Sequence, residues 1–73
     1  MMVDWSLVLC RLRSSRGSLE KVAREVHSSP VHLRRVARGE LQDTKFMVGL
    51  RLLDMHYDDY PEEHAKLSIF KDR

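Results

Sequence analysis

The stretch that decides the fold of this 73-residue chain is SLEKVAREVHSSPVHLRRVARGE, which runs from Ser18 to Glu40. Its apolar residues recur at helical spacing in two groups, separated by a short polar turn. The first group is Leu19, Val22, Ala23 and Val26, and the second is Leu33, Val36 and Ala37. This periodicity predicts two short helices, each with one buried face. The sequence therefore predicts a helix-turn-helix within a small helical domain.

Capping signals set the ends of both helices. Ser18 can cap the first helix. Ser29 followed by Pro30 is typical of an N-cap and a first helical position, because a backbone N–H would have no partner at that position anyway. Gly39 stops the second helix at the position that most favours glycine. We therefore expect the second helix over residues 30–38.

The outward face of the second helix carries the candidate functional residues. At 100° per residue this face gathers three arginines and a valine, and the helix carries no acid. Arginine can pair with both acceptors of guanine, and valine can contact the methyl group of thymine, so the face suits the major groove of DNA. His32 lies at the flank, within reach of a base edge or a phosphate. We expect the DNA-binding residues to be Ser29, Pro30, Val31, His32, Arg34, Arg35, Arg38 and Lys45.

Helical periodicity continues on both sides of this motif. A first helix is expected from about Asp4 to Arg13, ended by residues 14–17. Its inner stripe is Trp5, Val8, Leu9 and Leu12. A fourth helix is expected over residues 45–57, capped by Asp43 or Thr44. Its core face is assigned to Phe46, Leu50, Leu53 and Tyr57.

The C-terminal part is expected to be less regular. Residues 58–61 form a turn, and Pro61 can open a last short helix. Residues 66–71 fit either a frayed helix or a short strand. The predicted fold class is all-α, with four to five helices and a short extended segment as an alternative at the C-terminus. Residues 1–60 are expected to form the DNA-binding domain, and residues 61–73 a tail that can serve in dimerisation.

The fourth helix is apolar on two sides, because it also carries Val48, Leu52 and Met55 opposite its assigned core face. Such a helix is expected to be covered on both sides. Either the C-terminal segment folds back over the second face, or this face forms a dimer interface, which we favour. The expected dimerisation residues are Val48, Leu52, Met55, Leu67, Ile69 and Phe70.

Positive charge is concentrated in the part of the chain that holds the motif. Residues 1–40 carry eight Lys and Arg against four Asp and Glu, whereas residues 41–73 carry five against seven. Seven of the nine arginines lie in the first part. Arginine is the side chain that binds phosphates and guanine edges with two parallel hydrogen bonds. This part therefore suits an anionic partner, although a solvated basic surface is the plain alternative.

The composition argues against several other classes of protein. No apolar run approaches the roughly 20 residues that span a bilayer, so no membrane partner is expected. The start of the chain lacks the basic region and cleavage site of a signal peptide. The single cysteine, Cys10, cannot form an internal disulfide and is expected to be an inert, partly buried thiol. A cytoplasmic location follows from these features.

The polar residues also argue against an enzyme. The four histidines lack the spacing of a metal site. The acidic residues Asp58, Asp59, Glu62 and Glu63 are interpreted as a solvated surface, because a chain this short is not expected to enclose a catalytic pocket. No enzymatic activity, metal, cofactor or small-molecule ligand is expected.

Taken together, residues 22–40 resemble the helix-turn-helix of the Cro/CI-type, lambda-repressor-like superfamily of phage repressors. The family pattern has an aliphatic residue and an alanine, a further aliphatic residue, a turn with a Ser or Thr cap, two inward aliphatic residues and a closing Arg-Gly-Glu. The matching residues are Val22, Ala23, Val26, Ser29, Leu33, Val36, Arg38, Gly39 and Glu40. The fourth helix is similar too, through Phe46, Leu50 and Leu53, so the resemblance covers residues 5–57.

The departures from the family pattern lie in the first helix of the motif, in the turn and at the start of the second helix. His27 stands where the family has a glycine with a left-handed backbone, a conformation that is more costly for histidine. Ser28 replaces an aliphatic residue, and Leu19 replaces a glutamine that contacts phosphate. Pro30 and Val31 replace polar residues that begin base reading. The bases that this chain reads therefore do not follow from the family.

The resemblance and the cationic face together predict a sequence-specific transcriptional repressor of phage or plasmid type. It would act as a homodimer on a palindromic operator in double-stranded DNA. The alternative is an antitoxin-type module that binds a protein partner through its acidic C-terminal third and autoregulates its operon. A more distant alternative is a helix-turn-helix that binds protein only.

Overall fold

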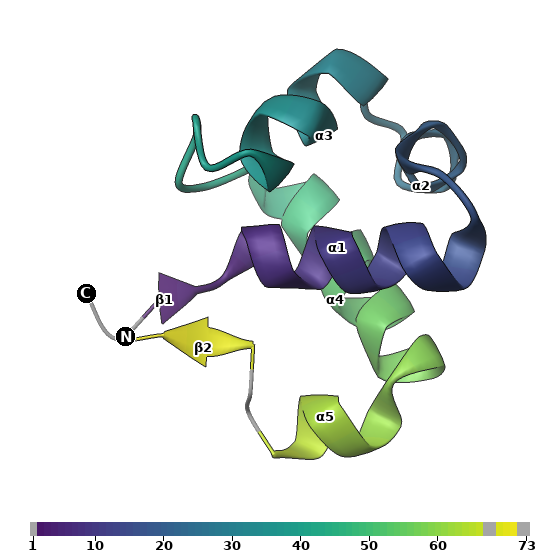
Figure 1. Ribbon diagram of the computed structural model, residues 1–73, viewed down its shortest axis with the longest axis vertical. Helices are drawn as coiled ribbons and strands as arrows, with labels where there is room; N and C mark the ends of the chain where they lie inside the picture. The colour runs from purple at the N-terminus through teal and green to yellow at the C-terminus, as the bar shows by residue number, and fades with distance from the viewer. Residues whose placement is uncertain (1, 67–68, 72–73) are drawn as a thin grey trace.

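The computed structural model describes residues 2–66 and 69–71, and within them the chain is mostly helical (Figure 1). The helices are α1 (Trp5–Arg16), α2 (Leu19–Glu25), α3 (Pro30–Ala37), α4 (Phe46–Asp59) and α5 (Pro61–Ala65). Two short strands, β1 (Met2–Val3) and β2 (Phe70–Lys71), pair antiparallel. The all-α fold class is therefore confirmed, and so is the short extended segment near the C-terminus.

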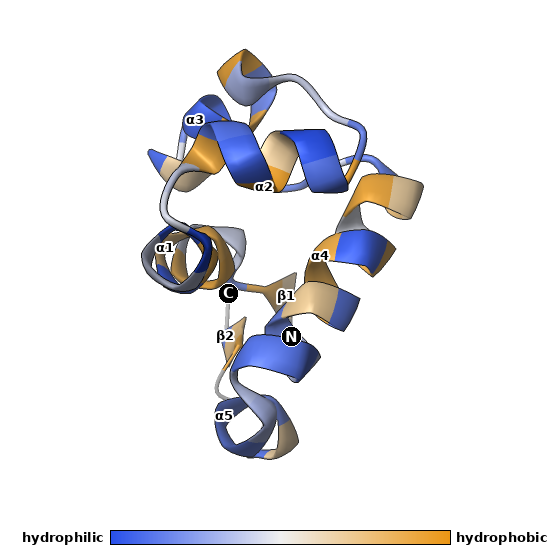
Figure 2. Ribbon diagram, turned by 90° about the vertical axis from the view of Figure 1, so that its right-hand side faces the viewer, coloured by the Kyte–Doolittle hydropathy of each residue, from blue (hydrophilic) through white to orange (hydrophobic). Residues whose placement is uncertain are grey.

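Helix α1 is the central element of the domain. It packs against α2, α3 and α4. In Figure 1, α1 lies across α4, with α2 and α3 at one end of the molecule and α5 at the other, and the view turned by 90° in Figure 2 keeps this order. Helix α2 is seen nearly end-on in Figure 1 while α3 runs across the view, so the two helices cross instead of lying antiparallel.

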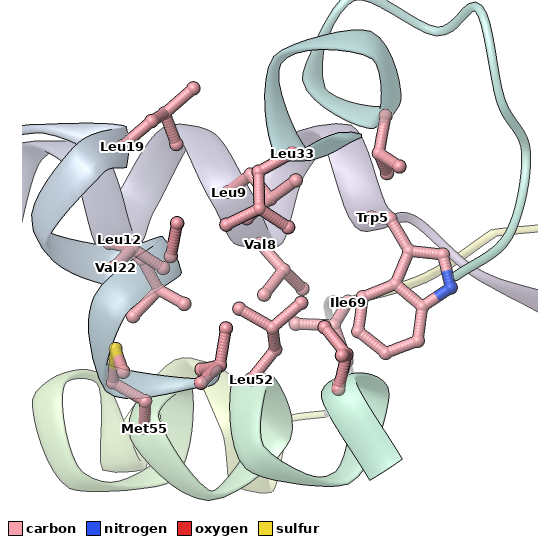
Figure 3. Packing of buried hydrophobic residues seen from close by; sticks show 14 residues of the cluster. Trp5, Val8, Leu9, Leu12, Leu19, Val22, Leu33, Leu52, Met55 and Ile69 are labelled. Carbon is pink, nitrogen blue, oxygen red and sulfur yellow. The ribbon is translucent and has the colours of Figure 1, made fainter. Parts of the chain in front are cut away.

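The core confirms the apolar stripes expected for the first three helices. Leu9, Leu12 and Val22 are fully buried, and Leu33 of α3 reaches the same cluster. Figure 3 shows these side chains converging on Leu52 of α4. The complete buried set from α1, α2 and α3, with Val26 just after α2, is Trp5, Val8, Leu9, Leu12, Leu19, Val22, Ala23, Val26, Leu33 and Val36.

The predicted core face of α4 is wrong. Its buried apolar side chains are Val48, Leu52 and Met55, whereas Phe46 is 76% exposed and Leu50 is 43% exposed. Tyr57 is also exposed, and Leu53 is only partly buried. The reason lies in Gly49, which is buried on the same side as Leu52.

A glycine at this position lets α4 approach α1 closely. A Cβ on Gly49 would lie 3.1 Å from Cη2 of Trp5, which is tighter than ordinary van der Waals contact. The side of α4 that carries the glycine is therefore the side that fits against the tryptophan ring. This local fit turns Val48, Leu52 and Met55 inward, so they cannot form the dimer interface expected from the sequence.

The C-terminal segment folds back onto the domain, which was the alternative to a dimer interface on the fourth helix. Ile69 is 1% exposed and belongs to the same core cluster as Leu52 (Figure 3), which contradicts its assignment to a dimer interface. Its carbonyl accepts a hydrogen bond from the backbone N–H of Asp4. Phe70 pairs with Val3 across the two strands and packs half-buried against the core. Leu67, the remaining predicted dimerisation residue, lies outside the described residues.

The described parts of residues 61–73 are therefore integrated into the domain and do not form a separate tail. Helix α5 begins at Pro61, as predicted, and packs against α4. The strand β1 at the other end of the chain has no counterpart in the sequence analysis. A two-residue strand has too few residues for any alternation of polar and apolar side chains to be recognised.

Two helices extend further than the sequence predicted, and one ion pair joins their ends. Helix α1 continues to Arg16, and α4 continues to Asp59. The guanidinium of Arg16 donates two hydrogen bonds to the Asp59 carboxylate, at 2.7 and 2.9 Å, and the hydroxyl of Ser15 donates a third at 2.6 Å. The hydrogen bond raises the pKa of Arg16 and lowers the pKa of Asp59. The pair favours helical structure up to both residues.

The cap expected at the start of α4 is not formed. Helix α4 begins after Lys45 without a side-chain cap. The Asp43 carboxylate instead accepts hydrogen bonds from Nε1 of Trp5, at 3.1 Å, and from the backbone N–H of Thr44, at 2.8 Å. Asp43 therefore fastens the loop before α4 to α1.

Candidate nucleic-acid interface

The turn between α2 and α3 has the left-handed residue that the family resemblance implied. His27 has a φ of 58°, the only positive φ of a non-glycine residue in the described part of the chain. This conformation brings the N–H of Ser28 to 2.9 Å from the Ala23 carbonyl, so the end of α2 is satisfied by the backbone. The turn is therefore held by hydrogen bonds despite a residue that is strained at this φ.

Both ends of α3 are closed by the signals seen in the sequence. The hydroxyl of Ser29 accepts a hydrogen bond from the N–H of His32 at 3.0 Å, and Pro30 occupies the first turn. At the other end, Gly39 has a φ of 81°, and the N–H of Glu40 donates to the Arg35 carbonyl at 3.0 Å. The predicted caps are confirmed, and α3 is an eight-residue helix with defined ends.

Helix α1 holds the inward side of α3 in place. The hydroxyl of Ser6 lies 3.1 Å from the carbonyl oxygen of Ala37 and 3.3 Å from that of Val36, to which it can donate. Leu33 and Val36 are buried, as predicted, and Ala37 is partly buried beside them. The inward face of α3 is therefore packed, and its opposite face points to solvent.

The outward face of α3 has the composition expected from the sequence. Val31 is 60% exposed. The side chains of Arg34, Arg35 and Arg38 are between 43% and 62% exposed. The structure therefore brings these four residues together on one solvent-facing surface, which we call the α3 outer face.

Two acids that the sequence analysis did not place lie next to these arginines. Glu20 of α2 contacts Arg34 at 2.6 Å, and Glu40 contacts Arg38 at 2.7 Å and Arg35 at 3.5 Å. Glu40 follows Arg38 closely in sequence, but no local pattern could pair Glu20 with a residue 14 positions away. Exposed ion pairs of this kind contribute about 0–1 kcal/mol to stability. The guanidinium groups can therefore leave these carboxylates and bind other anions at little cost in free energy.

His32 of α3 contacts the loop that precedes α4. The Nε2 atom of His32 lies 3.0 Å from the hydroxyl of Thr44, so this ring nitrogen is occupied within the domain. The contact holds the end of the loop against the first turn of α3. Lys45, the next residue, is exposed there. Lys45 therefore directly follows the residue that contacts α3, and His32 is a loop contact in place of the side chain free to reach DNA that was expected from the sequence.

A hollow of about 330 Å³ lies between α1, α2 and α3. Its lining includes Cys10, Arg13, Arg34 and Arg38. Cys10 is exposed, which corrects the expectation of a partly buried thiol. The side of the hollow formed by Arg34 and Arg38 continues into the α3 outer face, so positive charge extends from α3 onto α1.

A second polar cluster lies away from α3, where α1, α4 and α5 meet. His56 is fully buried, with Nε2 3.2 Å from Nη1 of Arg11 and Nδ1 3.1 Å from Nδ1 of His64. Because a guanidinium can only donate, Nε2 of neutral His56 accepts, and Nδ1 then carries the proton that is donated to His64. Burial is the main cause that lowers the pKa of His56, and the charges of Arg11 and His64 lower it further.

No group of three or more His, Cys, Asp or Glu side chains in the part of the chain that the structure describes could hold a metal ion. None of the described helices has both the length and the apolar character needed to cross a membrane.

Fold and surface together define a small all-α domain with two crossed helices joined by a tight turn, the second of which presents a cationic outer face. Comparison of the chain with protein-family models, with curated proteins and with solved structures finds no match.

Proposed function

We propose that this protein binds double-stranded DNA sequence-specifically through α3 and represses transcription as a homodimer on a palindromic operator. The observation that carries the proposal is the α3 outer face, where three arginines and an exposed valine share one side of a capped, solvent-facing helix. The major groove of B-DNA admits an α-helix, and arginine and valine match guanine edges and thymine methyl groups.

Each part of the face has a separate role in this proposal. Arg34 and Arg35 reach base edges, while Arg38, at the end of α3, and Lys45, just after the loop contact to α3, contact phosphates. The ion pairs with Glu20 and Glu40 hold the guanidinium groups in place in the free protein and are exchanged for DNA contacts. Ser29 and Pro30 fix the N-terminus of α3, where backbone N–H groups favour a phosphate.

The similarity of residues 22–40 to Cro/CI-type repressors supports the same reading, because the caps and the left-handed turn residue occupy the positions which that pattern requires. The target of the protein lies in the cytoplasm, where we propose that it acts.

The first experiment selects bound sequences from a random pool of double-stranded DNA. A symmetric consensus with two half-sites is expected, since a two-fold dimer reads the same bases twice. Recovery of unenriched DNA, or failure to bind any duplex at low salt, would contradict the proposal.

The second experiment measures the affinity of alanine variants for the selected operator. Arg34→Ala or Arg35→Ala should cost about 1–3 kcal/mol and relax base preference at one or two positions of each half-site. Lys45→Ala should weaken all sequences alike and lower the salt slope by about one. Lys66→Ala is the matched control, because it removes one exposed positive charge after α5, at the opposite end of the molecule from α3. An equal, sequence-independent loss in all four variants would show that binding is electrostatic only.

A further inference from the structure

A second surface, on the outward side of α4, remains after the α3 outer face is assigned. It consists of Phe46, Met47 and Leu50, with half-buried Leu53 at its edge, and we call it the α4 outer patch. Phe46 is 76% exposed, Met47 is 53% exposed and Leu50 is 43% exposed. Contiguous large apolar side chains at such exposure mark interaction sites on small domains.

The patch combines a projecting side chain with a hollow. Phe46 lies at the rim of a hollow of about 230 Å³ and forms part of its lining. The rest of the wall includes the backbone of Gly49 and the side chains of Trp5 and Leu53. An aromatic ring is a good occupant of such a site, since aromatic pairs gain energy beyond the area they bury.

From these observations we propose that the α4 outer patch binds a second copy of this chain, with Phe46 of each copy seated in the hollow of the other. A two-fold pair brings the same patch together from both sides, so a projecting ring next to a hollow on one surface complements itself. The hollow is also lined by one acid and one base, Asp43 and Lys45. Two such rims can contact each other without net electrostatic repulsion, whereas a strongly charged partner would meet no excess of opposite charge.

The size of the patch sets the expected strength of the dimer. Helix α4 has 14 residues and is therefore about 21 Å long. A face one helix wide lies towards the small end of specific interfaces, so we expect dissociation constants on the order of micromolar in the free protein. The α4 outer patch would supply the contact of the homodimer in the proposed function, on which this inference rests. Because the test below contains no DNA, a failure to dimerise is distinguishable from a failure of α3 to bind DNA.

The test is sedimentation equilibrium of the full chain without DNA, from about 1 µM to about 500 µM. The wild type should show a reversible monomer–dimer equilibrium. Phe46→Glu combined with Leu50→Glu should raise the dissociation constant at least about a hundredfold, because charges would be buried without partners at the centre of the contact. Far-UV circular dichroism should show a wild-type fold, since both side chains are exposed in the monomer. Val31→Glu is the control, because Val31 is an exposed apolar residue on α3 and its change should leave dimerisation intact.

A second measurement tests the proposal even if the double variant does not fold. Leu50→Cys in a Cys10→Ser background should form an intermolecular disulfide on oxidation, because a two-fold contact places a residue near its own copy. Val31→Cys in the same background should not. A wild type that stays monomeric over the whole range would overturn the proposal and point to a different protein as the occupant, as for an antitoxin. The proposal would also be overturned if the double variant still dimerised, or if Leu50→Cys and Val31→Cys cross-linked equally.

Discussion

The outward faces of α3 and α4 differ in both chemistry and origin. The α3 outer face is cationic, and the helix that carries it is bounded by local signals: the Ser29 cap, the left-handed His27 and Gly39. The α4 outer patch is apolar, and α4 starts without a side-chain cap. Its orientation depends instead on packing against Trp5 and Ile69. One small domain therefore presents two surfaces of different chemistry. Local sequence signals define the first, and the packing of the core leaves the second exposed.

The largest expected effect comes from a charge placed on the buried side of α4, compared with the same charge on its exposed side. Leu52→Glu should unfold the domain or cost more than about 4 kcal/mol, because it buries an unpaired carboxylate among Val8 and Ile69. Leu50→Glu, on the opposite side, should change the free energy of unfolding by no more than about 0.5 kcal/mol. Urea titration followed by circular dichroism measures both variants. Equal effects would mean that the two faces of α4 are not distinct.

A smaller loss of stability is expected at acidic pH. It arises from His56, which is buried where α1, α4 and α5 meet. The pKa of His56 in the folded chain is lowered from its ordinary value of 6.5. The unfolded chain therefore takes up the proton first, so the stabilising contribution of neutral His56 is complete above pH 6.5 and declines as the pH falls below it. Thermal unfolding should accordingly show a lower midpoint at about pH 5 than at about pH 7.

Variants separate this effect from other titrations. His56→Met should remove most of the pH dependence in this window, whatever its own stability. Asp59 contributes elsewhere, because its pKa is lowered from 3.8 and its stabilising effect is lost only as the pH falls below that value. A midpoint that does not change between about pH 7 and about pH 5 would contradict a buried neutral His56.

The smallest expected effect lies in the turn before α3. His27 has a φ of 58°, so His27→Gly should stabilise the fold by about 0.5–1 kcal/mol through relief of backbone strain. Chemical denaturation with urea, followed by circular dichroism, measures the change. A loss of stability would mean that the histidine side chain makes a contact worth more than the strain.

The candidate DNA-binding surface was largely predictable because it depends on signals between residues close in sequence. The inward positions of Leu33 and Val36 follow from helical periodicity, and the exposure of Arg34 and Arg35 follows with them. Helical periodicity does not show which acidic side chains form ion pairs with these arginines. The contact between Glu20 and Arg34 exists only because α2 and α3 are folded against each other. Whether these arginines contact bases stays a prediction.

The helical class of the domain, the caps and ends of α2 and α3, and the buried stripe of α1 follow from the sequence, because each depends on neighbours within about a turn of helix. The choice of the buried face of α4 depends on tertiary contacts. Helix α4 has two apolar faces, and periodicity assigns equal weight to both. The choice was made by the approach of Gly49 to Trp5 and by Ile69, which returns to the core from the end of the chain. A buried face is selected by the surface that covers it, and that surface is formed by residues distant in sequence.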